Sequence, residues 1–330
     1  MANSRDTYLK ENETFMLNFC TLFDKNYLYK GLALYNSLKV HCPDFKLWIL
    51  CMDNETLELI QKLNLDSIQT ISLSEFETKD LLRVKSERNR AEYSWTCTAN
   101  LCRYLLTNKK VDAVTYLDAD LMFFDDPAPL FEEIDGYSIA IIEHRFPKGQ
   151  EKYEKTVGRF NVGFVYFKND QNGLACVNWW ADRVIEWCYD RVENGRFGDQ
   201  MYLNDWPERF KGVLIIKSKR IGSAPWNIKD TDTSLPIFYH FHAFKLLADD
   251  KFIEAKGYFI PAKKRQLLYV PYEKEIKRAI TEIRRIDPSF HAGYTKADLR
   301  EKFWHFLYND LLPERLIFWL TKIKHRFNEK

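Results

Sequence analysis

The chain has 330 residues, of which 46% are hydrophobic and 15% aromatic, so it can build a sizeable core and a disordered chain is excluded. Its formal net charge of +2 argues against a generally basic nucleic-acid-binding protein. Glycine is scarce, with 12 residues, and neither GxGxxG nor GxxxxGK[ST] occurs. A glycine-cradled dinucleotide site or a P-loop is therefore disfavoured.

The cysteines and the apolar runs indicate the compartment. Seven cysteines occur without a CxxC pair, mostly in apolar runs, which favours buried reduced thiols over disulfides or a zinc site. The start, MANSRDTYLKENETF, is polar and does not fit a signal peptide. No apolar run approaches the roughly 18 residues that span a bilayer. We therefore expect a cytoplasmic protein.

Strands and helices alternate along the first part of the chain. Residues 15–23, FMLNFCTLF, predict a buried strand that ends at a polar turn, and residues 27–40 have apolar positions at helical spacing. The predicted elements that follow are a strand at 46–52, a helix at 55–63, a strand at 68–73, a helix at 93–108 and a strand at 111–117. This alternation predicts an α/β domain with a mostly parallel sheet flanked by helices.

The second part of the chain continues the pattern and then changes in composition. The predicted elements are strands at 137–143 and 158–168, helices at 176–194 and from 197–206, strands at 213–216 and 237–241, and a charged helix at 272–285. The segment 302–327 is aromatic and amphipathic, with basic residues at its end. We therefore expect a main domain at 1–265 and a C-terminal helical extension at 266–330.

Two carboxylates follow the strand at 111–117. That strand is apolar and β-branched, as expected of a strand buried on both faces, and it leads into Asp118 and Asp120. Ligands bind at the carboxyl edge of open α/β sheets, and alternate strand residues share a face. The two charges would repel each other unless a cation lay between them, which favours Mg²⁺ or Mn²⁺. A second Asp-x-Asp pair, Asp230 and Asp232, lacks this context.

Two histidines end a late strand in the segment IFYHFHAFK. His240 and His242 each offer a third ligand suited to Mn²⁺, and Lys245 lies close enough in sequence to meet a phosphate. The ordinary alternative for either histidine is a hydrogen-bonded core or surface residue.

Ordered motifs from about residue 15 to residue 245 resemble the GT-A glycosyltransferases, specifically the family-eight-like retaining enzymes that use nucleotide sugars. The segments are FDKNY, CPDFKLWILCMD, CRYLL, YLDADLMFFDDPAPLF, FNVGFVYFKN, GDQMYLN and HFHAFK. SAPWN, at 223–227, resembles a segment of bacterial surface-polysaccharide glycosyltransferases. Where the family often continues HFxGxxKPW this chain has HFHAFKLL, so His242 competes with His240 as the ligand.

The resemblance implies a GT-A, Rossmann-like fold and the transfer of a hexose from a nucleotide sugar, expected to be UDP-linked. It implies that Asp118, Asp120 and His240 bind Mn²⁺ or Mg²⁺. The residues it implies for binding the metal-bound donor are Leu22, Asp24, Asn26, Arg103, Asp118, Ala119, Asp120, Asn161, His242 and Lys245. For Asp24 and Asn26 plain turn chemistry is the alternative, and for Arg103 a solvated helix charge or a brace for Asp118.

Asp199 and Gln200 are the catalytic candidates that the resemblance implies. Retaining relatives lack a clear general base, so the leaving phosphate is expected to accept the acceptor's proton. Asp199 or Gln200 would then stabilise positive charge on the sugar ring. Two alternatives stay open for Asp199, a nucleophile in a double displacement and a simple helix cap.

The expected partners are a nucleotide-sugar donor and a glycan or lipid-linked acceptor, with no nucleic acid. The segment 302–327 predicts either an interfacial helix on the inner-membrane surface or a helix packed on the main domain. Two other classes remain as alternatives: a catalytically inactive GT-A protein that binds sugar nucleotides, and a DxD phosphotransferase of the haloacid-dehalogenase type. The latter normally carries its motif at the first strand, unlike this chain.

Overall fold

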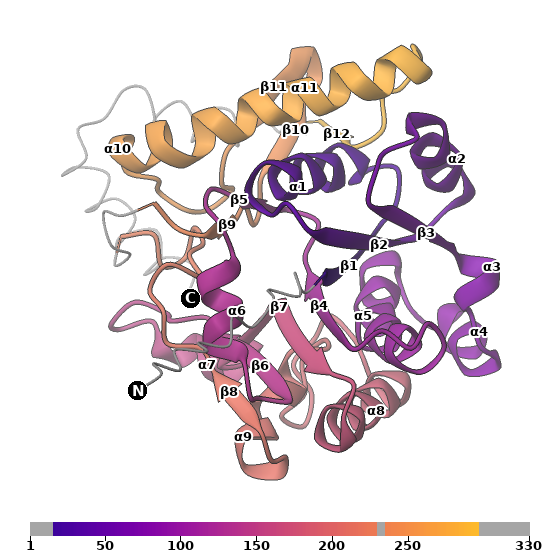
Figure 1. The fold of residues 1–330 in the computed structure, drawn as a ribbon. Helices are drawn as coiled ribbons and strands as arrows, with labels where there is room; N and C mark the ends of the chain where they lie inside the picture. Colours follow the sequence, from indigo (N-terminus) through magenta and orange to yellow (C-terminus); the bar gives the residue numbers. More distant parts are fainter. Residues whose placement is uncertain (1–15, 230–234, 297–330) are drawn as a thin grey trace, which may run out of the picture.

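The computed structural model describes residues 16–229 and 235–296, which fold around one large sheet (Figure 1). Its seven strands have the order β3-β2-β1-β4-β7-β6-β8. Their bounds are β1 Leu17–Phe23, β2 Phe45–Cys51, β3 Ile68–Ser72, β4 Ala113–Leu117, β6 Ile139–Glu143, β7 Phe160–Lys168 and β8 Val213–Ile215. The strands β1 to β4 pair in parallel, while β7 runs antiparallel to both β4 and β6. The predicted mixed α/β fold with a mostly parallel sheet is confirmed.

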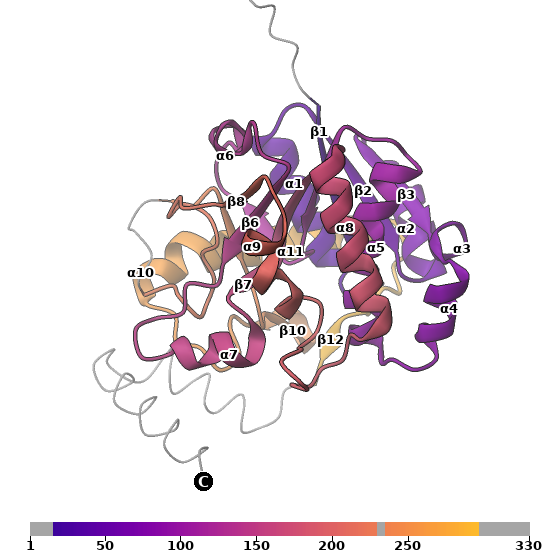
Figure 2. The same ribbon diagram turned by 90° about the horizontal axis from the view of Figure 1, so that it is seen from below.

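Helices cover both faces of this sheet. The helices are α1 Leu28–His41, α2 Asn54–Leu63, α3 Leu73–Phe76, α4 Lys79–Lys85, α5 Arg90–Thr107, α6 Ala128–Ile134, α7 Glu154–Val157, α8 Gln171–Glu186, α9 Trp206–Arg209, α10 Ala262–Lys264 and α11 Val270–Ile286. Helices α1, α2, α6 and α11 share one apolar cluster on one face, and α4, α5 and α8 share a second cluster on the other. Figure 2 shows α5 and α8 together on the second face.

The central strand β1 has no polar face, because helices cover both faces of the sheet. In β1, Phe19 and Phe23 enter one cluster while Cys20 and Leu22 enter the other, as the two-residue period of a strand requires. This explains why FMLNFCTLF is apolar at most positions rather than at every second one.

Side-chain caps determine where several helices begin, and these positions differ from those predicted from the apolar periodicity. Asp170 accepts hydrogen bonds from the backbone N–H groups of Asn172 and Gly173, so α8 begins at Gln171, and it ends at Glu186. The helix predicted at 176–194 therefore lies too far along the chain. The helix predicted from residue 197 is instead a short 3₁₀ turn, η2 (Met201–Asp205), followed by α9. Asn89 and Glu92 form a capping box that starts α5 three residues before the predicted position.

Two small sheets and four short turns complete the described residues. One sheet pairs β5 (Leu121–Phe123) with β9 (Phe238–His240), and the other contains β10 (Lys245–Leu247), β11 (Lys251–Ile253) and β12 (Tyr294–Thr295). The remaining turns are η1 (Glu151–Tyr153), η3 (Ala248–Asp250) and the π-helical η4 (Arg265–Tyr269). The β5–β9 pair links the chain just after β4 to a segment more than a hundred residues later.

Helix α11 lies along α1 and shares its core (Figure 1). Its side chains Tyr272, Ile276 and Ile280 are buried in the same cluster as α1 and α2. The described part of the predicted extension is thus packed on the main sheet, and the boundary at 265/266 stays a prediction. The amphipathic segment 302–327 lies outside the described residues. Within 16–229 and 235–296, no helix is both long and apolar enough to cross a membrane.

Candidate metal centre

The two aspartates lie in the tight connection between β4 and β5. The Asp118 N–H donates to the Gly163 carbonyl on β7 (3.1 Å), and the Leu121 N–H donates back to the Asp118 carbonyl (3.1 Å). In the β5–β9 pair Leu121 lies opposite His240, and the Phe241 N–H donates to the Asp120 carbonyl (2.9 Å). This register brings His240 to the carboxyl edge of the main sheet.

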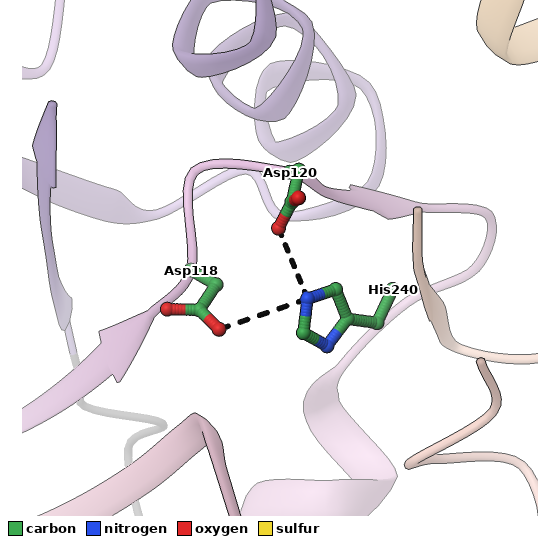
Figure 3. Close-up of side chains that lie close together, drawn as sticks. All are labelled: Asp118, Asp120 and His240. Atoms are coloured by element: carbon green, nitrogen blue, oxygen red, sulfur yellow. Dashed lines mark ion pairs between the residues drawn. The ribbon is translucent and has the colours of Figure 1, made fainter. Parts of the chain in front are cut away.

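The three side chains converge on one point (Figure 3). The Nε2 atom of His240 lies 3.0 Å from Asp120 Oδ1 and 3.7 Å from Asp118 Oδ2. One ligand atom from each residue lies within 4.8 Å of the other two, which is a spacing that one cation can bridge. Two carboxylates and an imidazole suit Mn²⁺ and also fit Mg²⁺, so these residues fit the predicted metal.

The charges in this cluster are strongly coupled. Burial raises the pKa of Asp118, and the charge of Asp120 raises it further. Burial also opposes ionisation of Asp120, yet His240 and the nearby Lys30 hold its pKa below the ordinary value. Burial lowers the pKa of His240, but the neighbouring carboxylates of Asp120 and Asp118 together outweigh this and the net shift is upward. A metal ligand must be a neutral imidazole, so metal binding would release the proton from a protonated His240.

Gly163 lets β7 approach the cluster closely. A Cβ atom at this position would lie 2.6 Å from Asn161 Oδ1, 3.1 Å from His240 Nδ1 and 3.2 Å from Asp118 Oδ2. Any other residue type would displace the Asn161 amide and press tightly against His240 and Asp118. The FNVG motif thus has a steric reason, because the strand itself forms the floor of the site.

Asn161 joins the cluster to a buried histidine. The Gly163 N–H donates to Asn161 Oδ1 (3.0 Å), so the Asn161 amide nitrogen faces His144 Nε2 at 3.2 Å and donates to it. Burial lowers the pKa of His144 to about 3, which keeps the ring neutral. A pocket beside these residues is lined by Leu121, Ile142, Glu143, Asn161, Gly163, Gly222, Ala224, Trp226, Phe238 and His240. Sequence reasoning missed His144.

Asp199 is buried close enough to Asp118 for their charges to interact. Burial first, and then the charge of Asp118, raise the pKa of Asp199 to about 8. Its carbonyl accepts a hydrogen bond from Trp180 Nε1 (2.9 Å). The capping position of η2 is Gln200, without a side-chain cap, so Asp199 does not cap this turn. The Gln200 amide donates to the Val157 carbonyl (2.6 Å).

The turn after β1 is held by its own side chains. Asp24 Oδ1 accepts from the Asn26 N–H (2.8 Å), and Asp24 also forms an ion pair with Arg90 at the start of α5. Asn26 Oδ1 accepts from the Gly293 N–H (3.1 Å), in the segment after α11. These contacts match the turn-chemistry alternative, and nucleotide binding by both residues stays a prediction.

Four other predicted donor-binding residues lie in different surroundings. Leu22 is buried in β1, and Ala119 is buried between the two aspartates. His242 is exposed, with its ring 5.9 Å from that of His240, and it is not one of the three converging ligands. Lys245 lies on β10, paired with Ile253 of β11.

Arg103 lies between α5 and α8. Its guanidinium contacts Asp182 (2.9 Å) and Asn100 (2.6 Å) rather than Asp118. The predicted brace for Asp118 is therefore not what the structure shows. That contact comes instead from Tyr116, whose hydroxyl donates to Asp118 Oδ1 (3.0 Å) from the same face of β4.

Lys30 is a second site residue that sequence reasoning missed. Its Nζ atom lies 3.7 Å from Asp120 Oδ2, and its side chain is only 3% exposed. The sequence signal was weak, because one lysine on an apolar helix gives no sign of its tertiary partner.

Comparisons with known proteins bear on the family and the fold of the chain. A family model described as "Glycosyl transferase family 8" matches residues 18–205, more than half of the chain. Two proteins of Bacillus subtilis (strain 168), each described as uncharacterized, are similar over most of their length. YfnD is 33% identical over 84% of this chain and 94% of its own, and YfnF is 31% identical over 85% and 98%.

Among solved structures, the galactosyltransferase LgtC in complex with donor and acceptor sugar analogues is similar, with a TM-score of 0.50 and 16% identity. The match covers 87% of this chain and 99% of LgtC. Likeness at this identity shows the fold alone, which is the GT-A arrangement that the sequence predicted. The family match adds the activity class: the chain belongs to glycosyl transferase family 8 and is a glycosyltransferase.

Proposed function

We propose that this protein transfers a hexose from a UDP-linked sugar to a glycan or lipid-linked acceptor, with metal dependence and retention of configuration. The observation that carries the proposal is the convergence of Asp118, Asp120 and His240 at the carboxyl edge of the sheet, beside a pocket. Ligand sites of open α/β sheets lie at this edge. Family membership supplies the reaction class, and the metal, the donor and the stereochemistry are our proposals.

The proposed chemistry separates the tasks of the site. Asp118, Asp120 and His240 would hold Mn²⁺ or Mg²⁺, which would supply Lewis acidity to the leaving diphosphate. Asn161, fixed by Gly163 and His144, would contact the sugar. The other proposed donor contacts are Leu22, Asp24, Asn26, Ala119, His242 and Lys245, and Arg103 has the weakest support.

Asp199 and Gln200 are our proposed catalytic residues. The charge of Asp118 contributes to the raised pKa of Asp199, so neutralising that charge would favour an ionised Asp199. A carboxylate there would stabilise positive charge on the sugar ring. The Gln200 amide would have to leave the Val157 carbonyl to reach a substrate.

Metal-dependent hydrolysis of nucleotide sugars tests the proposal. The wild type should hydrolyse at least one of a panel of UDP- and GDP-sugars with Mn²⁺ and not with EDTA. Asp120→Asn should lose at least about a hundredfold in rate, because a ligand charge is removed. Asp112→Asn, an exposed aspartate at the other end of β4, is the matched control and should keep its rate.

Three results would count against this proposal. Absence of metal-dependent turnover with every donor would reject the enzyme, and metal-dependent donor binding without turnover would instead identify an inactive sugar-nucleotide-binding protein. Equal loss in Asp112→Asn and Asp120→Asn would show that the effect is unrelated to the metal centre.

We also propose that the protein works in the cytoplasm and that residues 302–327 bring it to the inner-membrane surface. The support is the sequence of that segment alone, which is rich in aromatic residues and has basic residues at its end. A lipid-linked acceptor would be reached most easily from such a position.

A further inference from the structure

Lys30 is a buried cation at the start of α1. Its side chain is 3% exposed, and its Nζ atom lies 3.7 Å from Asp120 Oδ2 and 4.2 Å from the centre of the Tyr27 ring. Lysine is almost never this buried without a partner. Here the partner, Asp120, is shared, because its Oδ1 atom lies 3.0 Å from His240 Nε2.

The position is unfavourable for a cation in two ways. Burial removes the ammonium from water, and the first turn of a helix carries the positive end of the helix dipole. The first turn of this 14-residue helix contains no acidic residue that would offset the charge. Asp120 is therefore the compensating carboxylate that the structure places beside Lys30.

A loaded metal centre would change this balance. The ligands Asp118 and Asp120 carry two negative charges and His240 none when it binds a metal, so a divalent cation makes the cluster neutral. With Lys30 included, the site then has one positive charge in excess, because Asp120, the partner of Lys30, binds the metal. An anion next to the metal would offset that charge, and a diphosphate has oxygens enough to contact both cations.

We propose that Lys30 is a diphosphate-binding residue that exchanges Asp120 for an oxygen of the nucleoside diphosphate when the metal centre is loaded. This inference rests on the proposed function and deepens it, by naming a protein cation for the leaving group. The sequence suggested Lys245 for the phosphate contact. Lys245 lies on β10, which belongs to a different sheet from the β5–β9 pair that carries His240. Lys30 instead lies directly beside a proposed metal ligand.

Two titrations on the full-length protein test the role of Lys30. Mn²⁺ alone is titrated first, and then whichever of UDP and GDP the wild type binds more tightly, at saturating Mn²⁺. Lys30→Met should bind Mn²⁺ several-fold more tightly, because a neighbouring positive charge is gone. It should bind the nucleoside diphosphate about ten- to a hundredfold more weakly, the usual effect of losing a hydrogen bond to a charged group.

Matched variants separate charge from folding. Lys39→Met removes the same charge from the exposed end of the same helix, where the lysine is 57% exposed, and should leave both affinities unchanged. Lys30→Gln keeps a polar side chain and should reproduce both shifts of Lys30→Met. It carries the test if the methionine variant does not fold, as judged by circular dichroism.

Three results would overturn the inference. Unchanged nucleoside-diphosphate affinity in folded Lys30 variants would reject the contact while leaving the proposed function intact. Weaker Mn²⁺ binding with no further loss at saturating Mn²⁺ would show that Lys30 only orients Asp120. A wild type that binds neither Mn²⁺ nor a nucleoside diphosphate would reject the proposed function, and this inference with it.

Discussion

At the scale of single residues, the site is a set of buried charges that compensate one another. His240 is held between two carboxylates, and Lys30 lies on the far side of one of them. A buried charge is tolerated only when it is paired, so every member of this set depends on the others. Asp199 differs from the others, because the charge that acts on its pKa is the like charge of Asp118.

Asp199 should make the metal-free protein less stable as pH rises. Its pKa of about 8 in the folded state exceeds the ordinary 3.8, so between these values the folded state binds the extra proton. Stability then falls with rising pH, by up to about 1.4 kcal/mol per pH unit. Asp199→Asn lacks this dependence. Its free energy of unfolding should therefore rise relative to that of the wild type as pH rises between these two values, as measured by urea unfolding in EDTA.

The exposed aspartate Asp182 supplies the control for that measurement. Its side chain is 61% exposed. The free energy of unfolding of Asp182→Asn should therefore change with pH in the same way as that of the wild type. If that of Asp199→Asn also changes in this way, Asp199 ionises normally in the folded protein and the case for its burial-driven protonation fails.

At the scale of elements, the decisive contact is between a late strand and an early loop. The strand β9 adds to β5, and this pairing brings His240 beside the aspartates. Behind β9, the ring of Phe241 stacks on Tyr272 of α11, with centroids 3.6 Å apart and planes 8° apart. Helix α11 thus supports the segment that carries His240, the proposed histidine ligand, although the helix lies beyond the predicted main domain.

Removing that support should affect both stability and metal binding. Tyr272→Ala should lower the free energy of unfolding by about 3–5 kcal/mol, as large aromatic truncations in a core do. It should also weaken Mn²⁺ binding, because Phe241 and His240 lose their backing. Urea unfolding and a Mn²⁺ titration of the folded variant measure the two effects.

Tyr272→Phe is the conservative counterpart. The Tyr272 hydroxyl is buried and has no hydrogen-bond partner in the part of the chain that the structure describes. Its removal should therefore leave stability equal or slightly higher, with Mn²⁺ affinity unchanged. Normal Mn²⁺ affinity in folded Tyr272→Ala would mean that α11 has no part in positioning His240.

At the scale of the whole molecule, residues 16–229 and 235–296 already close both faces of the sheet. The two apolar clusters include helices on each face, with α11 completing one of them. Burial of these clusters is the main contribution to the stability of the fold. Residues 302–330 lie outside the described part of the chain, so their predicted role in membrane binding is tested by deletion.

Deletion of residues 302–330 tests that role. The truncated protein should keep its unfolding midpoint and its Mn²⁺ affinity, and should lose binding to vesicles that contain anionic lipid. Loss of the cooperative unfolding transition would instead favour a segment packed on the main domain. Undiminished vesicle binding would place the membrane contact elsewhere.

The sequence by itself determined the fold class, the strand before Asp118 and Asp120, and the family resemblance. These are local patterns: a strand buried on both faces is apolar throughout, and a motif keeps its spacing whatever surrounds it. The ends of the helices were harder to predict from the sequence, because the capping hydrogen bonds of Asp170 and Asn89 set where α8 and α5 begin.

Only the tertiary structure decided which side chains meet. The choice between His240 and His242 depends on the β5–β9 register, in which His240 lies opposite Leu121. The contacts of Lys30 with Asp120, of His144 with Asn161 and of Arg103 with Asp182 each join two different elements of the fold. No local period encodes such contacts, because they follow from how helices and strands pack once the sheet has formed.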